Sequence, residues 1–435
     1  MTMTRDDRHT PAPLRLAGVA ALFFSLFLTA AAAGQSTLNP IPATPDTSGA
    51  AQAPLPPLPA APRPTIMIDL DRNLPRLHSV AAVEALVDTI ARTGFGRIIV
   101  DVKLRDGRVL FPSRVAPPLD AGFDYFEAFR KAADRHDIDV IAYASVFAEG
   151  DPSTGKGLAY EHPEWQQMLM IEGRGVLRQA ESPEAGQFIL LNPLLPSVQK
   201  YEATSISDMI QNLKPDAILL NETRFISRES DLSDSSRVSF DAWTGLSPLD
   251  WPKDILDKEH PRFPLWQAFR VGVIHEFVNR IKTLRDGVAP GMPIILSAPA
   301  YWEPATTLGV NWAHSTFRPN LWYATDRFRA RGLADIVDEL ALVSRDANPA
   351  AIREIMIGVR RATRHQRPVG LILLVEQFQN RPGRLLEAVQ TLNNGGFGVT
   401  VSDAGQIGAY GMWDVLAEAI RPNPPKPDSP DGGGR

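Results

Sequence analysis

The sequence contains no cysteine at any of its 435 positions. This absence excludes disulfide bonds, thiol nucleophiles and thiolate metal sites, as well as an N-terminal cysteine that could carry a lipid. The eight histidines are scattered, and no HExxH or similar metal-binding spacing occurs. We therefore expect no metal site and no cofactor, although carboxylates alone could still hold Ca2+ or Mg2+.

Signatures of other function classes are also missing. No GxSxG motif occurs, so a serine hydrolase is poorly supported. No GxGxxG motif follows the first β-rich run at 65–70, which argues against a dinucleotide-binding, doubly wound sheet. The formal net charge of -5 argues against nucleic acid or an anionic membrane surface as the partner.

The N-terminal region has the plan of a secretory signal. Arg5, Arg8 and Arg15 precede an apolar run from Leu16 to Ala33 that ends in small residues. We expect residues 1–34 to be a signal peptide and the mature protein to be secreted or periplasmic, with no stable insertion in the membrane after cleavage. An uncleaved membrane anchor is the alternative, because the run approaches the ~20 residues that span a bilayer.

Low-complexity segments flank a single expected domain. Residues 35–64 are rich in Pro, Ala, Ser and Thr and predict a disordered linker, and residues 421–435 predict a disordered tail. Between them, β-rich runs alternate with segments of helical periodicity, including a helix expected over 321–333. The β-rich runs are 65–70, 97–104, 140–147, 217–225, 293–301, 336–343, 369–378 and 396–404.

Eight such pairs predict a (β/α)8 barrel over residues 65–420, with long insertions after the third and fourth strands. An open, doubly wound sheet is the alternative architecture. In a barrel, the residues at the carboxyl ends of the strands converge on the face that carries activity. The polar residues at those ends are Asp69, Asp71, Asp101, Lys103, Asn221, Glu222, Glu376 and Asp403.

Glu222 and Glu376 are the best-placed pair for cleaving a glycosidic bond, which needs two carboxyl groups. They follow the fourth and seventh strands, which face each other across an eight-stranded ring. A separation of ~5 to 5.5 Å would suit retention of configuration, and ~6.5 to 9.5 Å would suit inversion. The alternative is that Glu222 only pairs with Arg224 at the rim and that Glu376 is a solvated loop residue.

Six further residues are candidate substrate contacts, each with a structural alternative. Asp101 and Lys103 either contact substrate or form an ion pair with each other at the mouth. The remaining four are Asp69 and Asp403, which could instead hydrogen-bond loop amides, and Tyr301 and Trp302, which are sugar platforms or pack under the loops.

The Asn221 and Glu222 pair resembles that of the superfamily of retaining barrel glycosidases, in which an Asn-Glu pair follows strand four and a Glu follows strand seven. This resemblance implies that Glu222 is the acid and base, that Glu376 is the nucleophile, and that Asn221 binds a hydroxyl beside the cleaved bond. Only these three residues support it.

A broader resemblance covers most of the domain. The chain resembles the glycosyl-hydrolase-like family often described as family 10 glycosylhydrolase or alpha-amylase-like. Such membership implies a secreted or envelope-associated barrel that acts on, or binds, a polysaccharide or oligosaccharide. The segments that support the resemblance are DVKLRDGRVLFPSRVAP, AYASVFAEG, EHPEW, LLNPLLPSVQKY, PDAILLNETRF, DLSDSSRVSFDAWTG and WPKDI.

One departure from this family bears on activity. The family pattern after strand four reads DGIxLDRxRY, whereas this chain has DAILLNETRF, so Asn221 replaces an Asp while Arg224 is kept as a substrate contact. An amide cannot act as acid, base or nucleophile. Either Glu222 takes over the carboxylate role, or the barrel binds glycan without cutting it. The outcome depends on whether the strand has already ended at Glu222, since a one-residue shift within a strand reverses the face.

Overall fold

The computed structural model describes residues 55–183, 185–246 and 250–421. The expected signal peptide, most of the expected linker and the tail after residue 421 lie outside the described residues. Within the described ranges, no helix is both long enough and apolar enough to cross a membrane.

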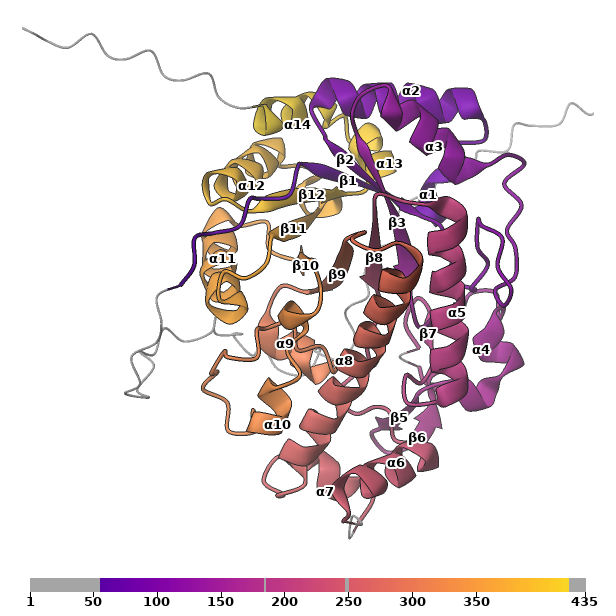
Figure 1. Ribbon diagram of the computed structural model, residues 1–435, viewed down its shortest axis with the longest axis vertical. Coiled ribbons are helices and arrows are strands. Elements are labelled where there is room, and N and C mark those ends of the chain that lie inside the picture. The colour runs from indigo at the N-terminus through magenta and orange to yellow at the C-terminus, as the bar shows by residue number, and fades with distance from the viewer. Residues whose placement is uncertain (1–54, 184, 247–249, 422–435) are drawn as a thin grey trace, which may run out of the picture. The chain divides into compact units, whose positions relative to one another are not determined.

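Eight parallel strands form a closed barrel in which each strand is paired with its neighbours in chain order (Figure 1). This ring confirms the predicted (β/α)8 architecture and excludes the open sheet. The barrel strands are β1 (Thr65–Ile68), β2 (Arg97–Asp101), β3 (Asp139–Ser145), β8 (Ala217–Asn221), β9 (Ile294–Pro299), β10 (Glu339–Ser344), β11 (Val369–Leu374) and β12 (Gly398–Ser402).

Helices follow the strands and end at the predicted signals. For example, the Ser79 side chain accepts a hydrogen bond from Ala82 N at the start of α2, and Gly94 ends that helix with φ of 102°. The long helices are α2 (Val80–Thr93), α3 (Tyr125–Asp134), α5 (Pro196–Leu213), α8 (Phe263–Val288), α11 (Pro349–Thr363), α12 (Pro382–Asn394) and α14 (Trp413–Ile420).

The helix expected over 321–333 is largely wrong. This region contains only α10 (Asp326–Arg329), after the short α9 (Trp302–Thr307), and then a single turn, η3 (Leu333–Asp335). Thr325 starts α10 by accepting a hydrogen bond from Phe328 N, so the chain before it is not helical. Gly332 then has an extended backbone, with φ of -71° and ψ of 124°, so the helix does not continue through it.

Side chains alternate along the strands between the helical shell and the barrel interior. Ile98 packs in the core shared with the helices, whereas Arg97 reaches across the interior to Glu339 of β10, at 2.9 and 3.0 Å. Asp101 has the same parity as Arg97 and lies in register with Tyr143 of β3. Asp101 and Tyr143 therefore face the interior at the carboxyl ends of their strands, at the mouth of the barrel.

The predicted long insertions after the third and fourth strands are present. The first contains the antiparallel pair β4 and β7 and the hairpin of β5 and β6. The elements of the two insertions are β4 (Ala148–Gly150), α4 (Leu158–Glu161), η1 (Pro163–Trp165), β5 (Met168–Ile171), β6 (Gly175–Arg178), η2 (Gln179–Glu181), β7 (Ile189–Leu190), α6 (Asp234–Thr244) and α7 (Lys253–Leu256).

The buried carboxylate of Asp231 joins the two insertions. From the first insertion it accepts hydrogen bonds from Met168 N at 2.5 Å and Asn192 Nδ2 at 2.6 Å. From its own insertion it accepts them from Ser233 Oγ at 2.5 Å and Ser236 Oγ at 2.6 Å. Asp231 is 0% exposed, so these donors replace the water that its charge would otherwise require.

We expect Asp231→Asn to lower the free energy of unfolding by about 2 to 4 kcal/mol, because an amide nitrogen facing these donors cannot accept their hydrogen bonds. Chemical denaturation of the full chain would measure this loss. Asp234→Asn is the matched control, since the Asp234 side chain is 92% exposed at the start of α6. Equal stability of the two variants would contradict the role given to Asp231.

Candidate active site

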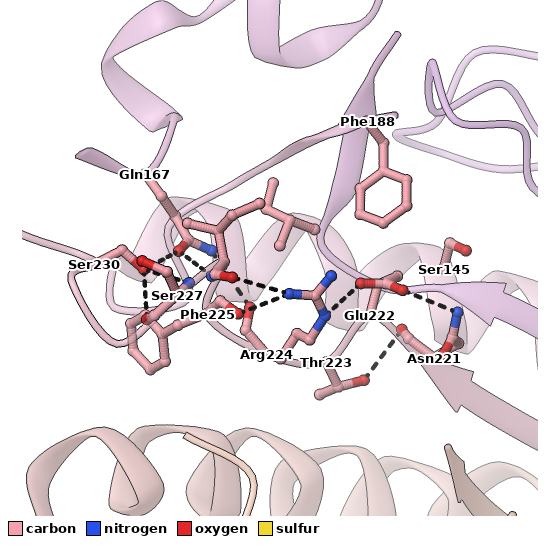
Figure 2. A network of polar contacts seen from close by, with 12 residues as sticks. Ser145, Gln167, Phe188, Asn221, Glu222, Thr223, Arg224, Phe225, Ser227 and Ser230 are labelled. Atoms are coloured by element: carbon pink, nitrogen blue, oxygen red, sulfur yellow. Dashed lines mark hydrogen bonds and ion pairs between the residues drawn. The ribbon is translucent and has the colours of Figure 1, made fainter. Parts of the chain in front are cut away.

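Glu222 follows the last residue of β8, so its side chain is not forced to the face opposite that of Asn221. Its backbone has φ of 49°, which lies outside the strand region. The Asn221 side chain reaches it, with Nδ2 at 3.4 Å from Glu222 Oε1 (Figure 2). The strand has therefore ended before Glu222, which removes the geometric objection to a carboxylate role at this position.

Arg224 holds the other oxygen of Glu222. The Arg224 Nε donates to Glu222 Oε2 at 2.6 Å, and both side chains are buried. The guanidinium also donates to the Phe225 carbonyl at 3.0 Å and lies 6.0 Å from the centre of the Phe188 ring (Figure 2). The ion pair between Glu222 and Arg224 that the sequence offered as the alternative is thus present. Among the described residues, Glu222 Oε1 receives a hydrogen bond only from Asn221, and this contact is long, at 3.4 Å.

Glu376 lies just after β11, in the single turn η4 (Val375–Phe378). It is half-buried, and its Oε2 accepts a hydrogen bond from Gln406 Nε2 at 3.0 Å. Burial raises the pKa of the Glu376 carboxyl, while the Gln406 hydrogen bond and the charges of Arg72 and Arg345 oppose that rise. A carboxyl with a raised pKa that is still partly open to solvent is suited to donating a proton.

Arg345, immediately after β10, connects the two glutamates electrostatically. Burial lowers the pKa of its guanidinium, and the carboxylates of both Glu376 and Glu222 act against that lowering. One cationic side chain therefore lies within the field of both acids. Arg345 was not among the residues expected at the mouth, although it directly follows the sixth strand, as the predicted mouth residues follow theirs.

Three aspartates lie on the β1, β2 and β12 side of the mouth, and all three bind backbone amides. Asp69 accepts from Arg72 N at 3.0 Å, Asp403 accepts from Gln406 N at 3.0 Å, and Asp101 accepts from Lys103 N at 3.2 Å. Asp69 and Asp403 therefore make the hydrogen bonds to loop amides that were the alternative to substrate contact. Burial raises the pKa of Asp101 well above its ordinary value, and the neighbouring Asp69 charge adds to the rise.

Lys103 forms no ion pair with Asp101, which corrects that part of the sequence interpretation. The Lys103 ammonium is buried, 2.6 Å from Glu149 Oε1 of β4 and 3.1 Å from Glu202 Oε2 of α5. It also donates to the Val146 carbonyl at 2.8 Å. Lys103 is 3% exposed, so in this structure it links β2 to the first insertion instead of facing the mouth.

A comparison with known families tests the resemblance to a glycosyl-hydrolase-like family. The family model described as glycosyl hydrolase-like 10 matches residues 73–366, more than half of the chain. The chain belongs to this family. The matched region includes Glu222, Arg224 and Arg345, while Glu376 and Asp403 follow it.

Solved structures similar to this glycosyl hydrolase-like 10 chain are glycosidase barrels. The glycoside hydrolase domain of PgaB (BpsB) from Bordetella bronchiseptica has a TM-score of 0.59 and 16% identity, over 82% of this chain and 98% of that one. Alpha-L-fucosidase isoenzyme 2 from Paenibacillus thiaminolyticus has a TM-score of 0.56 and 16% identity, over 82% of this chain and 48% of that one. At this identity the likeness establishes the fold alone.

A curated relative is much longer than this family member. The S-layer-related protein from Niallia circulans is 23% identical over 283 residues, which cover 58% of this chain and 18% of the relative. The chain therefore spans less than a fifth of that relative's length, and the similarity concerns one part of it.

The two aromatic candidates after β9 have different environments in this glycosyl hydrolase-like barrel. Tyr301 is half-buried, and its hydroxyl donates to the Asp346 carboxylate. Trp302 is 3% exposed, and its Nε1 donates to Asn311 Oδ1 at 3.0 Å. The Trp302 ring also packs edge-on against Phe317, at 5.5 Å between ring centres. Trp302 thus packs beneath the loops, whereas Tyr301 stays near the mouth through its contact with the residue after Arg345.

Nothing in the described ranges assembles three His, Asp or Glu side chains that could hold a metal ion.

The buried Lys103, Glu149 and Glu202 group predicts a pH-dependent stability. Burial raises the pKa of Glu149. Burial together with the nearby Glu149 charge raises the pKa of Glu202 well above the ordinary value, and Lys103 opposes both rises. The folded chain thus binds these protons more tightly than the unfolded chain does. Stability contributed by the protonated carboxyls is lost as the pH rises from the ordinary glutamate range through the raised values.

We expect Glu202→Gln to remove most of this loss, because the remaining Glu149 then balances Lys103. Relative to the unmodified chain, the free energy of unfolding of this variant should be about 1 to 2 kcal/mol larger at pH 8 than at pH 4.5, so the variant gains stability at the higher pH. Lys103→Met should do the opposite and destabilise the fold by about 3 to 5 kcal/mol at pH 8. Urea unfolding at the two pH values tests this. A Glu202→Gln effect that is independent of pH would refute the claim that the raised pKa of Glu202 destabilises the fold at high pH.

Proposed function

We propose that this chain is a glycoside hydrolase that cleaves a polysaccharide or glycoconjugate with Glu222 and Glu376 at the mouth of its barrel. The observation behind the proposal is that Glu222 and Glu376 lie just after β8 and β11 at the same end of the closed barrel, where both carboxylates also act on Arg345. Two carboxyl groups around one site are what hydrolysis of a glycosidic bond requires. The family and the barrel support the reaction class.

The environments of the two carboxyls favour a division of roles opposite to the one implied by the resemblance. Glu376, with its raised pKa, is the general acid that protonates the leaving oxygen. Glu222, ion-paired with Arg224 at 2.6 Å, is the carboxylate that attacks the sugar or activates water. Its Oε1 is the reacting atom in this assignment, because Oε2 is engaged by the guanidinium.

We further propose that the protein acts at the cell envelope or outside the cell. The signal-like residues 1–34 and the absence of cysteine are compatible with export. Partial likeness to an S-layer-related protein adds a surface-associated relative. Cell fractionation with an antibody to the chain would test this, and recovery of uncleaved chain in the cytosol would count against it.

A second candidate function is a barrel that binds glycan without cleaving it. The observation in its favour is Asn221, an amide where the family resemblance expects a carboxylate. In this alternative the ion pair of Glu222 and Arg224 is only structural, and Glu376 contacts a hydroxyl.

A glycan panel scored for both binding and cleavage separates the two functions. The full chain would be run through gels containing xylan, β-glucan, chitosan, starch or bacterial cell-wall glycan, and each would be assayed for release of reducing ends. The hydrolase proposal expects at least one polysaccharide to be both bound and cleaved. Binding without cleavage across the panel would favour the second function, and no binding at all would reject both.

A further inference from the structure

Tyr143 is a mouth residue that the sequence pattern did not single out. It lies in β3, in register with Asp101 of β2, and its side chain faces the barrel interior at the level of the mouth. The charges of Asp101 and Glu222 both act on its phenol. Tyr143 therefore stands between the aspartate side of the mouth and the proposed reacting carboxylate.

The hydrogen bonds of the Tyr143 hydroxyl leave its proton available. A phenol oxygen donates one hydrogen bond and accepts others through its lone pairs. Asn221 Nδ2 donates to this oxygen at 2.5 Å, and Ser145 Oγ donates to it at 3.1 Å. Among the described residues, no acceptor receives the proton of Tyr143. Two donors thus fix the oxygen, and the proton is directed elsewhere.

Asn221 is the reason that the proton is not taken by the protein. A carboxylate at this position would accept the phenol proton, whereas the amide group of Asn221 donates to the phenol oxygen instead. Burial also raises the pKa of Tyr143 well above its ordinary value, with the Asp101 charge adding to the effect. The phenol consequently remains a neutral donor throughout the range in which the carboxyls titrate.

The surroundings of that proton match one kind of ligand group. A sugar hydroxyl both accepts and donates a hydrogen bond. Tyr143 supplies a donor, and Asp101 of the neighbouring strand supplies carboxyl oxygens. A hydroxyl placed between them could accept the phenol proton and donate its own proton to the Asp101 carboxyl, whereas an ether oxygen could only accept and a methyl group could do neither.

We propose that Tyr143 is a substrate-binding residue, which donates its phenol proton to a hydroxyl of the sugar held between Asp101 and Glu222. This inference rests on the proposed function in that the ligand is a carbohydrate. It adds the requirement that the sugar in this position carries a free hydroxyl. It also gives Asn221 a positioning role, which is to orient the Tyr143 hydroxyl instead of performing acid or base chemistry.

Tyr143→Phe removes the donor and keeps the ring. On the panel polysaccharide that the full chain binds, we expect affinity electrophoresis to show binding about 3- to 10-fold weaker for this variant, the range for loss of one hydrogen bond. Tyr323→Phe is the matched control. The Tyr323 hydroxyl is buried and makes a long contact, at 3.5 Å, with Thr306 Oγ1 of α9. This control should bind as tightly as the unmodified chain.

A second measurement separates a direct contact from a local disturbance of structure. Saturation-transfer NMR would compare methyl glycosides of the bound sugar with their monodeoxy analogues. For the analogue that lacks the contacted hydroxyl, the full chain and Tyr143→Phe should bind equally. If instead the variant weakens binding of every analogue by the same factor, Tyr143 has only a structural role and the proposal fails.

The outcomes also distinguish this proposal from the proposed function. Weaker binding by Tyr143→Phe in a chain that cleaves nothing would support the hydroxyl contact and reject hydrolysis. Unchanged binding by this variant in a chain that cleaves glycan would reject the contact and leave hydrolysis standing. If the full chain binds none of the panel polysaccharides, both proposals are overturned.

Discussion

Glu376→Gln is expected to lower kcat on an unactivated polysaccharide by about 10²- to 10⁴-fold, the usual contribution of a positioned general acid. Glutamine keeps the shape of the side chain and its contact with Gln406, which lies 3.0 Å from Oε2, but it cannot release a proton. Binding of the polysaccharide should survive, because the mouth loses no volume. Reducing-end assays under saturating substrate would measure the effect.

The pH dependence of activity is an independent test of Glu376 as the general acid. A general acid works only while protonated, and burial raises the pKa of Glu376, so activity should fall as the pH rises through this raised value. The alkaline limb should therefore lie above the ordinary glutamate range. With a 2,4-dinitrophenyl glycoside, whose leaving group needs no proton, Glu376→Gln should keep much of its activity and lose this limb.

Glu387→Gln is the control for this variant, since Glu387 is exposed on α12 at a distance in sequence from the barrel end of β11. It should leave kcat and the pH profile unchanged. An alkaline limb that persists in Glu376→Gln would assign the acid to another group, and Asp101, whose pKa is raised well above its ordinary value, would be the first to examine.

Glu222→Gln is expected to reduce kcat at least as strongly, by about 10³-fold or more, because it removes the carboxylate that attacks the sugar or activates water. An activated leaving group should restore the activity of Glu376→Gln but not that of Glu222→Gln. The variant also leaves the buried Arg224 guanidinium without its anionic partner at 2.6 Å, which destabilises the fold as well. Activity must therefore be compared with the folded fraction, measured by circular dichroism on the same preparation.

Glu229→Gln is the matched control for that structural effect. Glu229 lies in the same insertion and is ion-paired with Arg228 at 2.9 Å, but this pair is partly exposed. The control should therefore retain both fold and activity. A well-folded Glu222→Gln chain that turns over substrate at the normal rate would remove Glu222 from the mechanism and favour a purely structural ion pair.

The barrel was predictable because its signal is local and repeated. Each strand is a short buried run, and each long helix has an apolar period and end signals such as Gly94 after α2. The strand ends were less predictable, since 217–225 was expected as a strand whereas β8 ends at Asn221. Apolar residues such as Phe225 continue beyond the strand because the insertion that follows has its own buried contacts.

Side-chain partners were predictable only where neighbours in sequence remain neighbours in space. Arg224 binds Glu222, two residues away, as one alternative foresaw. Lys103 was expected near Asp101, but it binds Glu202, which is 99 residues away on α5, and no local pattern signals that contact. Tyr143 was missed for the same reason, because its role depends on how the Asn221 amide is oriented on the next strand of the ring.

The most direct test of the account is whether Glu222 and Glu376 act in one chemical event. Reducing-end release would be measured for the unmodified chain, for Glu222→Gln, for Glu376→Gln and for the double variant, all on one polysaccharide that every form binds. Residues that act as a unit have non-additive effects, so we expect the double variant to be no slower than the slower single variant. Single losses that multiply in the double variant, or full activity in either single variant, would contradict the account.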